Sequence, residues 1–190
     1  MPKVLLGVTG SVAATLAPRL VEALLTTNME VKVVATERAF AFFESREIKT
    51  EIFNDGHEWT GDIYKPGSKI LHIELRKWAD ILLIAPLTAN TLAKMAYGLA
   101  DNLLTSVARA WDRQKPLILA PAMNTQMWEH PATAEHLEKL KAWYPKLTIV
   151  PPAEKLLACG DVGIGALAPI DQIVEAVKQG VGDVHTDRGA

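Results

Sequence analysis

Three residues of this 190-residue chain have side chains suited to proton transfer or to binding a polar substrate: His72, Asn124 and Cys159. Cys159 is the only cysteine, and it lies in a glycine-rich segment, residues 157–166. A free cysteine is commonly a small buried hydrophobe, but a glycine-rich loop is a poor place to bury one. The glycine content therefore predicts a mobile flap. Because a thiol with a reference pKa of about 8.5 is mostly protonated at neutral pH, Cys159 on this flap could serve as a proton donor.

The predicted elements around His72 and Asn124 suggest what each side chain could do. His72 is predicted to open a helical segment that runs to Asp80. The positive end of a helix dipole disfavours a protonated imidazole, so this ring could serve as a base, although a lone histidine in such a place is also commonly structural. Asn124, within residues 121–128, follows a predicted strand, and open α/β sheets bind ligands beyond the carboxyl ends of their strands.

The turn after the first predicted strand has the composition of a phosphate site. Gly10 allows a tight turn into a helix, and the free N–H groups of a first helical turn attract anions. Ser11 can cap that helix or donate its hydroxyl to a phosphate. The chain has neither the Gly-x-Gly-x-x-Gly fingerprint nor a Gly-Lys-Ser/Thr loop at this turn, so a mononucleotide phosphate fits better than a dinucleotide or a nucleoside triphosphate. A plain glycine turn with a serine cap is the alternative.

Two further strand ends carry polar side chains. Thr36 follows the second predicted strand and is interpreted as a helix cap near the same crevice. Thr88, Asn90 and Thr91 follow the third, where capping alone would use one of them. We therefore expect this third strand end to form part of a ligand rim.

Short apolar runs that alternate with segments of helical period predict the elements that hold these residues. Strands are expected at 3–8, 31–35, 81–85, 117–120 and 147–150, and helices at 12–26, 91–111 and 133–143. Strands that are apolar on both faces belong in a parallel sheet covered by helices on each side. The chain is predicted to be a single α/β domain with a doubly wound, Rossmann-like three-layer sheet of five or six strands. The domain spans 1–179, with a surface excursion at 45–69, and a flexible tail occupies 180–190.

Composition and patterning exclude several classes of protein. A single cysteine rules out a disulfide scaffold and a cysteine-based zinc module. Twenty Lys+Arg against 22 Asp+Glu argue against nucleic acid as a partner. His130 and His136, six residues apart, do not share a helix face, and no metal site is predicted. With no recognisable signal peptide or membrane-spanning segment, the expected location is cytoplasmic.

The motifs taken together resemble the homo-oligomeric flavin-containing cysteine decarboxylase family. The residues that carry the resemblance are 10–13, 71–80, 85–92, 101–104, 109–112, 121–128 and 157–161. They follow the family's order along the chain from residue 3 to about 178. The Pro-x-Met-Asn-x-x-Met-Trp motif at 121–128 is highly specific, whereas the glycine turn alone is weak. The family often has serine where this chain has Thr88, which retains the hydroxyl.

The resemblance implies a flavodoxin-like fold, bound FMN and a homotrimer whose active sites lie between subunits. FMN contacts are implied for Gly10, Ser11, Val12, Thr36, Thr88, Ala89, Asn90, Thr91 and Ala122. Substrate contacts are implied for Asn124, Met127, Ala158 and Gly160. In this interpretation His72 is the base, Asn124 holds the substrate carboxylate and Cys159 on the flap is the proton donor.

The activity implied by the resemblance is FMN-dependent decarboxylation of 4'-phosphopantothenoylcysteine to 4'-phosphopantetheine in coenzyme A biosynthesis. The reaction would pass through a thioaldehyde and an ene-thiol, with no net redox change. A peptide C-terminal cysteine decarboxylase of the same family is the nearest alternative. A catalytically idle regulatory homologue is the other, although the chain keeps His72, Asn124 and Cys159 and has no long acidic extension.

Overall fold

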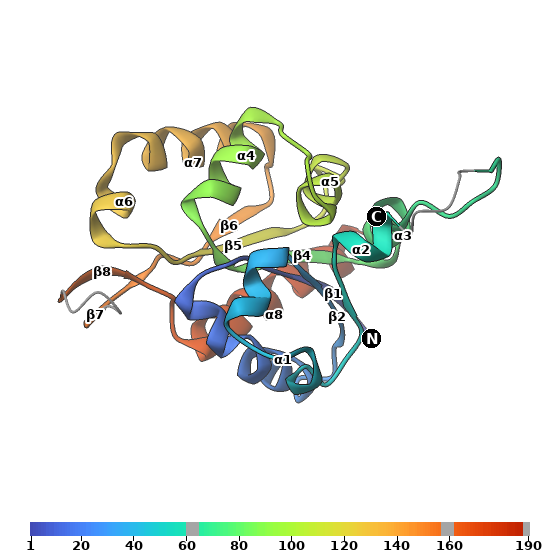
Figure 1. The fold of residues 1–190 in the computed structure, drawn as a ribbon, viewed down its shortest axis with the longest axis horizontal. Coiled ribbons are helices and arrows are strands. Elements are labelled where there is room, and N and C mark those ends of the chain that lie inside the picture. Colours follow the sequence, from blue (N-terminus) through green and yellow to red (C-terminus); the bar gives the residue numbers. More distant parts are fainter. Residues whose placement is uncertain (60–64, 157–161, 188–190) are drawn as a thin grey trace.

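The structure, a computed structural model, describes residues 1–59, 65–156 and 162–187 (Figure 1). Its centre is a six-stranded sheet in the order β3-β2-β1-β4-β5-β6, with every neighbouring pair parallel. The strands are β1 (Lys3–Val8), β2 (Glu30–Ala35), β3 (Ile52–Phe53), β4 (Ile81–Leu87), β5 (Leu117–Pro121) and β6 (Leu147–Ile149). Without the two-residue edge strand β3, the remaining order is that of flavodoxin-like sheets. The predicted fold class is confirmed.

Helices cover both faces of the sheet and form the two outer layers. The α-helices are α1 (Ala17–Leu25), α2 (Asp55–Glu58), α3 (Leu71–Trp78), α4 (Ala89–Tyr97), α5 (Leu103–Arg109), α6 (Thr125–Glu129), α7 (Pro131–Trp143) and α8 (Ile170–Asp187). Figure 1 shows α1 and α8 below the sheet and α4, α5 and α7 above it. The 3-10 helices are η1 (Val12–Leu16), η2 (Glu37–Ala41) and η3 (Ser45–Glu47).

The period-two alternation of strand side chains divides the apolar core between these layers. Val4 and Leu6 of β1 pack with α1 and α8 in one buried cluster, whereas Leu5 packs with α3, α4, α5 and α7 in the other. In β4, residues 81–84 are all fully buried. Strands enclosed on both faces explain why the sequence shows continuous apolar runs rather than alternation with polar residues.

Several predicted elements differ from the structure. The helix expected at 91–111 is two helices, because Gly98 ends α4 in the left-handed conformation, with φ of +72°, and Asn102 caps a new helix, α5. The excursion at 45–69 contains η3, β3 and α2, so part of it joins the sheet edge. Helix α8 continues past Gly180, where the tail was expected to begin, and reaches Asp187.

A two-stranded antiparallel hairpin, β7 (Ala153–Leu156) and β8 (Val162–Ala166), leaves the sheet after β6. Its strands enclose residues 157–161, which lie outside the described residues. The predicted donor Cys159 and the predicted substrate contacts Ala158 and Gly160 belong to that segment. Among the residues the structure describes, no helix is long and apolar enough to cross a membrane.

Candidate active site

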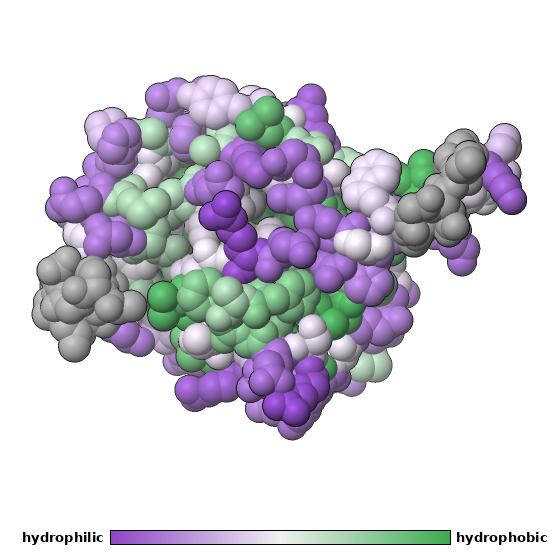
Figure 2. All heavy atoms as spheres, in the orientation of Figure 1, coloured by the Kyte–Doolittle hydropathy of each residue, from purple (hydrophilic) through white to green (hydrophobic). Residues whose placement is uncertain are grey.

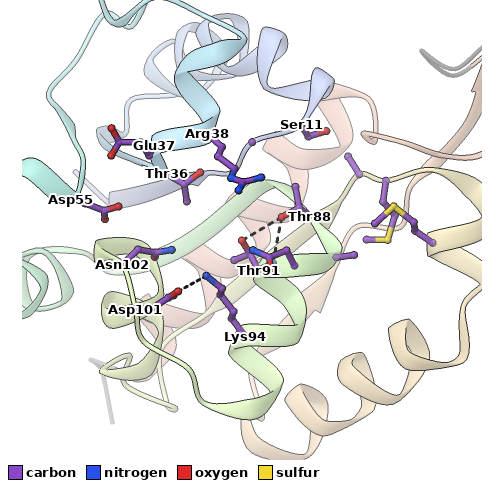
Figure 3. A pocket seen from close by; sticks show the side chains of 16 residues that line it. Ser11, Thr36, Glu37, Arg38, Asp55, Thr88, Thr91, Lys94, Asp101 and Asn102 are labelled. Atoms are coloured by element: carbon purple, nitrogen blue, oxygen red, sulfur yellow. Dashed lines mark hydrogen bonds and ion pairs between the residues drawn. The ribbon is translucent and has the colours of Figure 1, made fainter.

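A polar cleft of about 690 Å³ opens at the carboxyl edge of the sheet (Figure 3). Its wall includes residues that follow β1 and β4, and between these two strands the strand order reverses. This is the switch point at which doubly wound sheets bind ligands. The lining residues are Gly10, Ser11, Thr36, Glu37, Arg38, Asp55, Thr88, Ala89, Asn90, Thr91, Lys94, Asp101, Asn102, Ala122, Met123 and Met127.

Thr9 joins the two strand ends that bound the cleft. Its hydroxyl donates to the Pro86 carbonyl at 2.7 Å and accepts from the Thr88 N–H at 3.0 Å. The side chain is only 1% exposed, so water cannot replace these bonds. Thr9 therefore fixes the Gly10 turn against the start of α4.

The Gly10–Ser11 turn and the start of η2 form the upper wall of the cleft in Figure 3. A Cβ on Gly10 would stand 2.6 Å from the Arg38 Cβ, so this close approach requires glycine. The Ser11 hydroxyl caps η1 by accepting from the Ala13 N–H at 3.2 Å. The predicted cap is thus present, and Val12, the first residue of η1, points a 53% exposed side chain outward.

Thr36 holds the N-cap position of η2 without using its side chain as a cap. Its hydroxyl instead makes a long contact of 3.5 Å to the Val8 carbonyl. Two residues further, the exposed Arg38 directs its guanidinium into the cleft (Figure 3). Within the described ranges the Arg38 guanidinium has neither an ion-pair partner nor a hydrogen bond. This wall therefore offers the Arg38 guanidinium and the Thr36 hydroxyl to a ligand, and it also carries the Glu37 carboxylate.

The rim at the start of α4 is built by its capping interaction. The Thr88 hydroxyl accepts from the Thr91 N–H at 3.4 Å and donates to the Thr91 hydroxyl at 3.3 Å. Ala89 and Asn90 lie in the same first turn and line the cleft. One threonine therefore serves as the cap, while the Asn90 side chain remains exposed to a ligand.

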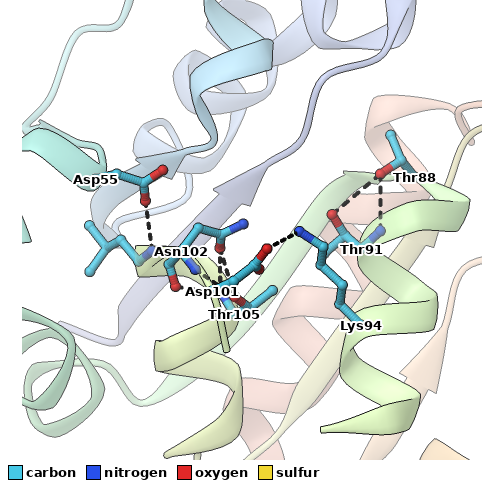
Figure 4. Close-up of polar contacts among 8 residues, drawn as sticks. Asp55, Thr88, Thr91, Lys94, Asp101, Asn102 and Thr105 are labelled. Atoms are coloured by element: carbon cyan, nitrogen blue, oxygen red, sulfur yellow. Dashed lines mark hydrogen bonds and ion pairs between the residues drawn. The ribbon is translucent and has the colours of Figure 1, made fainter. Parts of the chain in front are cut away.

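On the opposite side of the cleft the charged side chains already have hydrogen-bond partners (Figure 4). Lys94 donates to Asp101 at 2.6 Å, and this hydrogen bond holds the pKa of the Asp101 carboxyl below its usual range. Asn102 forms a capping box with Thr105, while Asp55 accepts from the Leu103 N–H at 2.7 Å. An anion would therefore find its open positive charge at Arg38 rather than at Lys94.

Asn124 caps the short helix α6, and its side-chain oxygen accepts from the Gln126 N–H at 2.9 Å. Its neighbours Met123 and Met127 line the cleft, whereas Asn124 itself does not. Strand β8 packs directly against this turn, and Gly165 approaches the Met123 carbonyl so closely that a Cβ at this position would collide with it. The Met123 N–H also donates to the Gly165 carbonyl at 2.9 Å. The hairpin that carries residues 157–161 is thus anchored beside Asn124.

His72 lies on α3 and does not line the cleft of its own chain. Its ring Nδ1 lies 2.5 Å from one oxygen of Glu58, and its backbone N–H donates to the other at 2.9 Å. In Figure 1, α3 lies at the opposite end of the molecule from α6 and the β7–β8 hairpin. One chain therefore does not bring His72 and Asn124 together.

The structure gathers most of the predicted cofactor residues around one cleft. The predicted residues that line it are Gly10, Ser11, Thr36, Thr88, Ala89, Asn90, Thr91, Ala122 and Met127. Sequence reasoning missed the charged lining, Glu37, Arg38, Asp55, Lys94 and Asp101, together with Asn102 and Met123. Two features of the sequence could have predicted some of these residues. Glu37 and Arg38 directly follow the predicted cap Thr36, and Lys94 lies one helical turn after Thr91.

The fold and the cleft define a doubly wound α/β protein that binds its ligand at the switch point of the sheet. The family model described as Flavoprotein matches residues 1–182, and the chain belongs to this family. The chain is 50% identical to the phosphopantothenoylcysteine decarboxylase of Mus musculus over 178 residues, which cover 93% of this chain and 85% of that protein.

Two solved structures are similar over nearly the whole chain. One is a mutant PPC decarboxylase complexed with pantothenoylaminoethenethiol, with 46% identity and a TM-score of 0.88 over 94% of this chain and 97% of that one. The other is the FMN binding protein AtHal3, with 46% identity and a TM-score of 0.84 over 94% of this chain and 95% of that one. The family resemblance read from the motifs is confirmed.

Proposed function

We propose that this chain catalyses the FMN-dependent decarboxylation of 4'-phosphopantothenoylcysteine to 4'-phosphopantetheine. The observation that carries the proposal is the 46% identity and TM-score of 0.88 to a PPC decarboxylase complexed with pantothenoylaminoethenethiol. The 50% identity to the mouse phosphopantothenoylcysteine decarboxylase supports the same activity. The chain is then a carboxy-lyase of coenzyme A biosynthesis.

The cleft fits FMN in size and in chemistry. Its volume of about 690 Å³ lies within the range of sites for ligands of this size. Gly10 has no side chain and packs closely on Arg38, so a phosphate could approach the backbone at this position. Ser11, Thr36 and the unpaired Arg38 guanidinium provide hydroxyls and a positive charge for a phosphate monoester.

We assign the phosphate of FMN to this wall. Val12 would contribute its backbone N–H, since the first N–H groups of a helix have no partner within it. The flavin ring would lie against Ala122 and the α4 rim of Thr88, Ala89, Asn90 and Thr91. When bound, FMN supplies reversible two-electron oxidation at the carbon that bears the substrate thiol.

The residues near α6 are assigned to the substrate. The Asn124 amide would hold the substrate carboxylate at the entrance to the cleft, beside Met127. Ala158 and Gly160 would contact the substrate from the segment between β7 and β8, and Cys159 in the same segment would donate a proton. The packing of β8 on the start of α6 supports this assignment, because Gly165 contacts Met123 and Gly163 lies against Thr125.

We infer a homotrimer in which His72 acts in the cleft of a neighbouring subunit. The support is geometric, since α3 and α6 lie at opposite ends of one chain (Figure 1). An apolar area beside the cleft, visible in Figure 2, is suited to subunit contact. The apolar residues of η1 and of η2 with its C-cap that are not fully buried include Val12, Ala13, Leu16, Phe40 and Phe42.

Each chain residue has one task in the reaction. His72 accepts the proton released when the cysteinyl carbon of the substrate is oxidised, and Asn124 holds the carboxylate beside the electron-poor thioaldehyde carbon. Carbon dioxide then leaves with its bonding electrons remaining on the substrate, giving the ene-thiol. The ene-thiol becomes 4'-phosphopantetheine when the electron pair removed in the first step is returned to it from the reduced cofactor and Cys159 supplies the accompanying proton, so substrate and product differ only by carbon dioxide.

Subunit complementation tests the shared site together with the activity. His72→Asn and Asn124→Ala should each abolish decarboxylation when every subunit of the oligomer carries the same substitution. Coexpressed, they should form mixed oligomers in which some clefts combine a normal His72 with a normal Asn124, and measurable activity should return. Incubation of the wild type with a C-terminal cysteine peptide is the comparison arm, and preferential release of carbon dioxide from the peptide would overturn the proposed substrate.

A further inference from the structure

Glu58 holds His72 through two separate hydrogen bonds. One carboxylate oxygen lies 2.5 Å from the ring Nδ1, and the other accepts from the His72 backbone N–H at 2.9 Å. The Glu58 side chain is only 5% exposed, compared with 25% for His72. A carboxylate this deeply buried requires hydrogen-bond partners, and His72 provides two of them.

The helix that carries Glu58 is itself fixed to the body of the molecule. Asp55, one turn earlier in α2, accepts from the Leu103 N–H at the start of α5. Asn54 and His57 form a capping box at the beginning of the same helix. Glu58 therefore approaches His72 from an anchored position rather than from a free loop.

We propose that Glu58 is a positioning residue that sets the tautomer and orientation of the His72 ring. A carboxylate accepts hydrogen bonds and does not donate them, so Nδ1 must carry the proton that faces Glu58. In the neutral ring Nε2 then has the lone pair. No hydrogen bond from the described part of the chain reaches Nε2, which leaves it available to an incoming proton.

The inference rests on the proposed role of His72 as the base and adds to it the group that prepares the base. A salt bridge that only fastened α2 to α3 would explain the distances equally well. The two interpretations predict different results when glutamine, a carboxamide, replaces Glu58. The single oxygen of glutamine can keep the backbone N–H of His72, but its NH₂ group would then face Nδ1. Nδ1 would have to accept, and the ring proton would move to Nε2.

Glu58→Gln is therefore the decisive variant, and Glu74→Gln is its matched control. Glu74 is an exposed carboxylate on the same helix, α3, with only a 3.9 Å contact to Lys77. Both variants lose one negative charge, and only the first touches His72. Nitrogen-15 spectra of the neutral imidazole report which nitrogen is protonated, and comparison with His72→Asn assigns the signal among the five histidines.

We expect wild type and Glu74→Gln to show the Nδ1–H tautomer, and Glu58→Gln to show Nε2–H. The kcat of Glu58→Gln should fall about 10²- to 10⁴-fold, the range of a general base, while KM and the melting temperature change little. An Nε2–H tautomer in wild type, or an unchanged kcat in Glu58→Gln, would overturn the inference. The wild-type spectrum keeps the test valid even where Glu58→Gln fails to fold. Full activity of His72→Asn would instead overturn the proposed role of His72 as the base, while the tautomer measurement would still report whether Glu58 sets the protonated nitrogen of the ring.

Discussion

Arg38 provides the sharpest prediction about how the cleft selects its cofactor. The guanidinium points into the cleft without an ion-pair partner among the described residues, while Lys94 is paired with Asp101. A charge-assisted hydrogen bond to phosphate contributes about 1.5–3 kcal/mol, and Arg38 is exposed, so the lower part of this range applies. At about 1.4 kcal/mol for each factor of ten, Arg38→Gln should weaken FMN binding roughly 10- to 30-fold.

Riboflavin separates the phosphate contact from every other effect of the substitution. It has the same ring and sugar chain as FMN but no phosphate, so its Kd should be unchanged in Arg38→Gln. Flavin fluorescence titration of the apoprotein measures both affinities. Arg46→Gln removes an equal charge from a side chain that is 82% exposed and lies outside the cleft, and it should behave as wild type.

The ratio of the two affinities decides the outcome. A loss confined to FMN, and one that shrinks at high salt, supports the assigned phosphate wall. Equal losses for FMN and riboflavin would mean that Arg38 shapes the cleft rather than binding phosphate. An unchanged FMN affinity, with a raised KM for phosphopantothenoylcysteine but not for its dephosphorylated form, would place the phosphate of the substrate there instead and refute the assignment.

Three further predictions concern the surroundings of the cleft. Thr9→Val keeps the shape but removes the bonds to Pro86 and Thr88, and denaturant unfolding should show a loss of about 1–3 kcal/mol. Because Lys94 lowers the pKa of Asp101 in the folded state, this pair stabilises the protein above the unfolded pKa of about 3.9. This contribution is lost as pH falls through the lowered pKa of Asp101 in the folded state. A small difference in unfolding free energy between wild type and Asp101→Asn at pH 7 should therefore vanish in acid titration. A difference that grows in acid would contradict the expected direction of the effect. Cys159→Ser should form carbon dioxide but accumulate an ene-thiol detectable by mass spectrometry, and normal turnover would remove Cys159 as the donor.

The sheet was predictable because its strands are enclosed on both faces. Residues 81–84 are buried completely, which makes the run in the sequence continuous and easy to recognise. By contrast β3 has two residues, too few for any periodicity to be visible. The break between α4 and α5 had local signals in Gly98 and Asn102, but helical spacing continues across it and concealed the break.

The candidate site was predictable only as far as strand ends reveal it. Gly10, Thr88 and their neighbours follow strands directly, so the switch-point rule located them. Glu58 lies on a four-residue helix inside a segment dominated by turn signals, and its contact with His72 spans 14 residues. Nothing local in a sequence reports such a contact. The separation of His72 from Asn124 likewise becomes visible only in three dimensions.

The central claim is the reaction itself, and the most direct measurement is product formation by the FMN-loaded wild-type protein. We expect 4'-phosphopantothenoylcysteine to be converted into 4'-phosphopantetheine and carbon dioxide in equal amounts, without consumption of an external oxidant or reductant. Mass spectrometry of the product together with trapped carbon dioxide measures both. A folded, flavin-loaded protein that leaves this substrate unchanged, or that needs a stoichiometric oxidant to release carbon dioxide, would contradict the account.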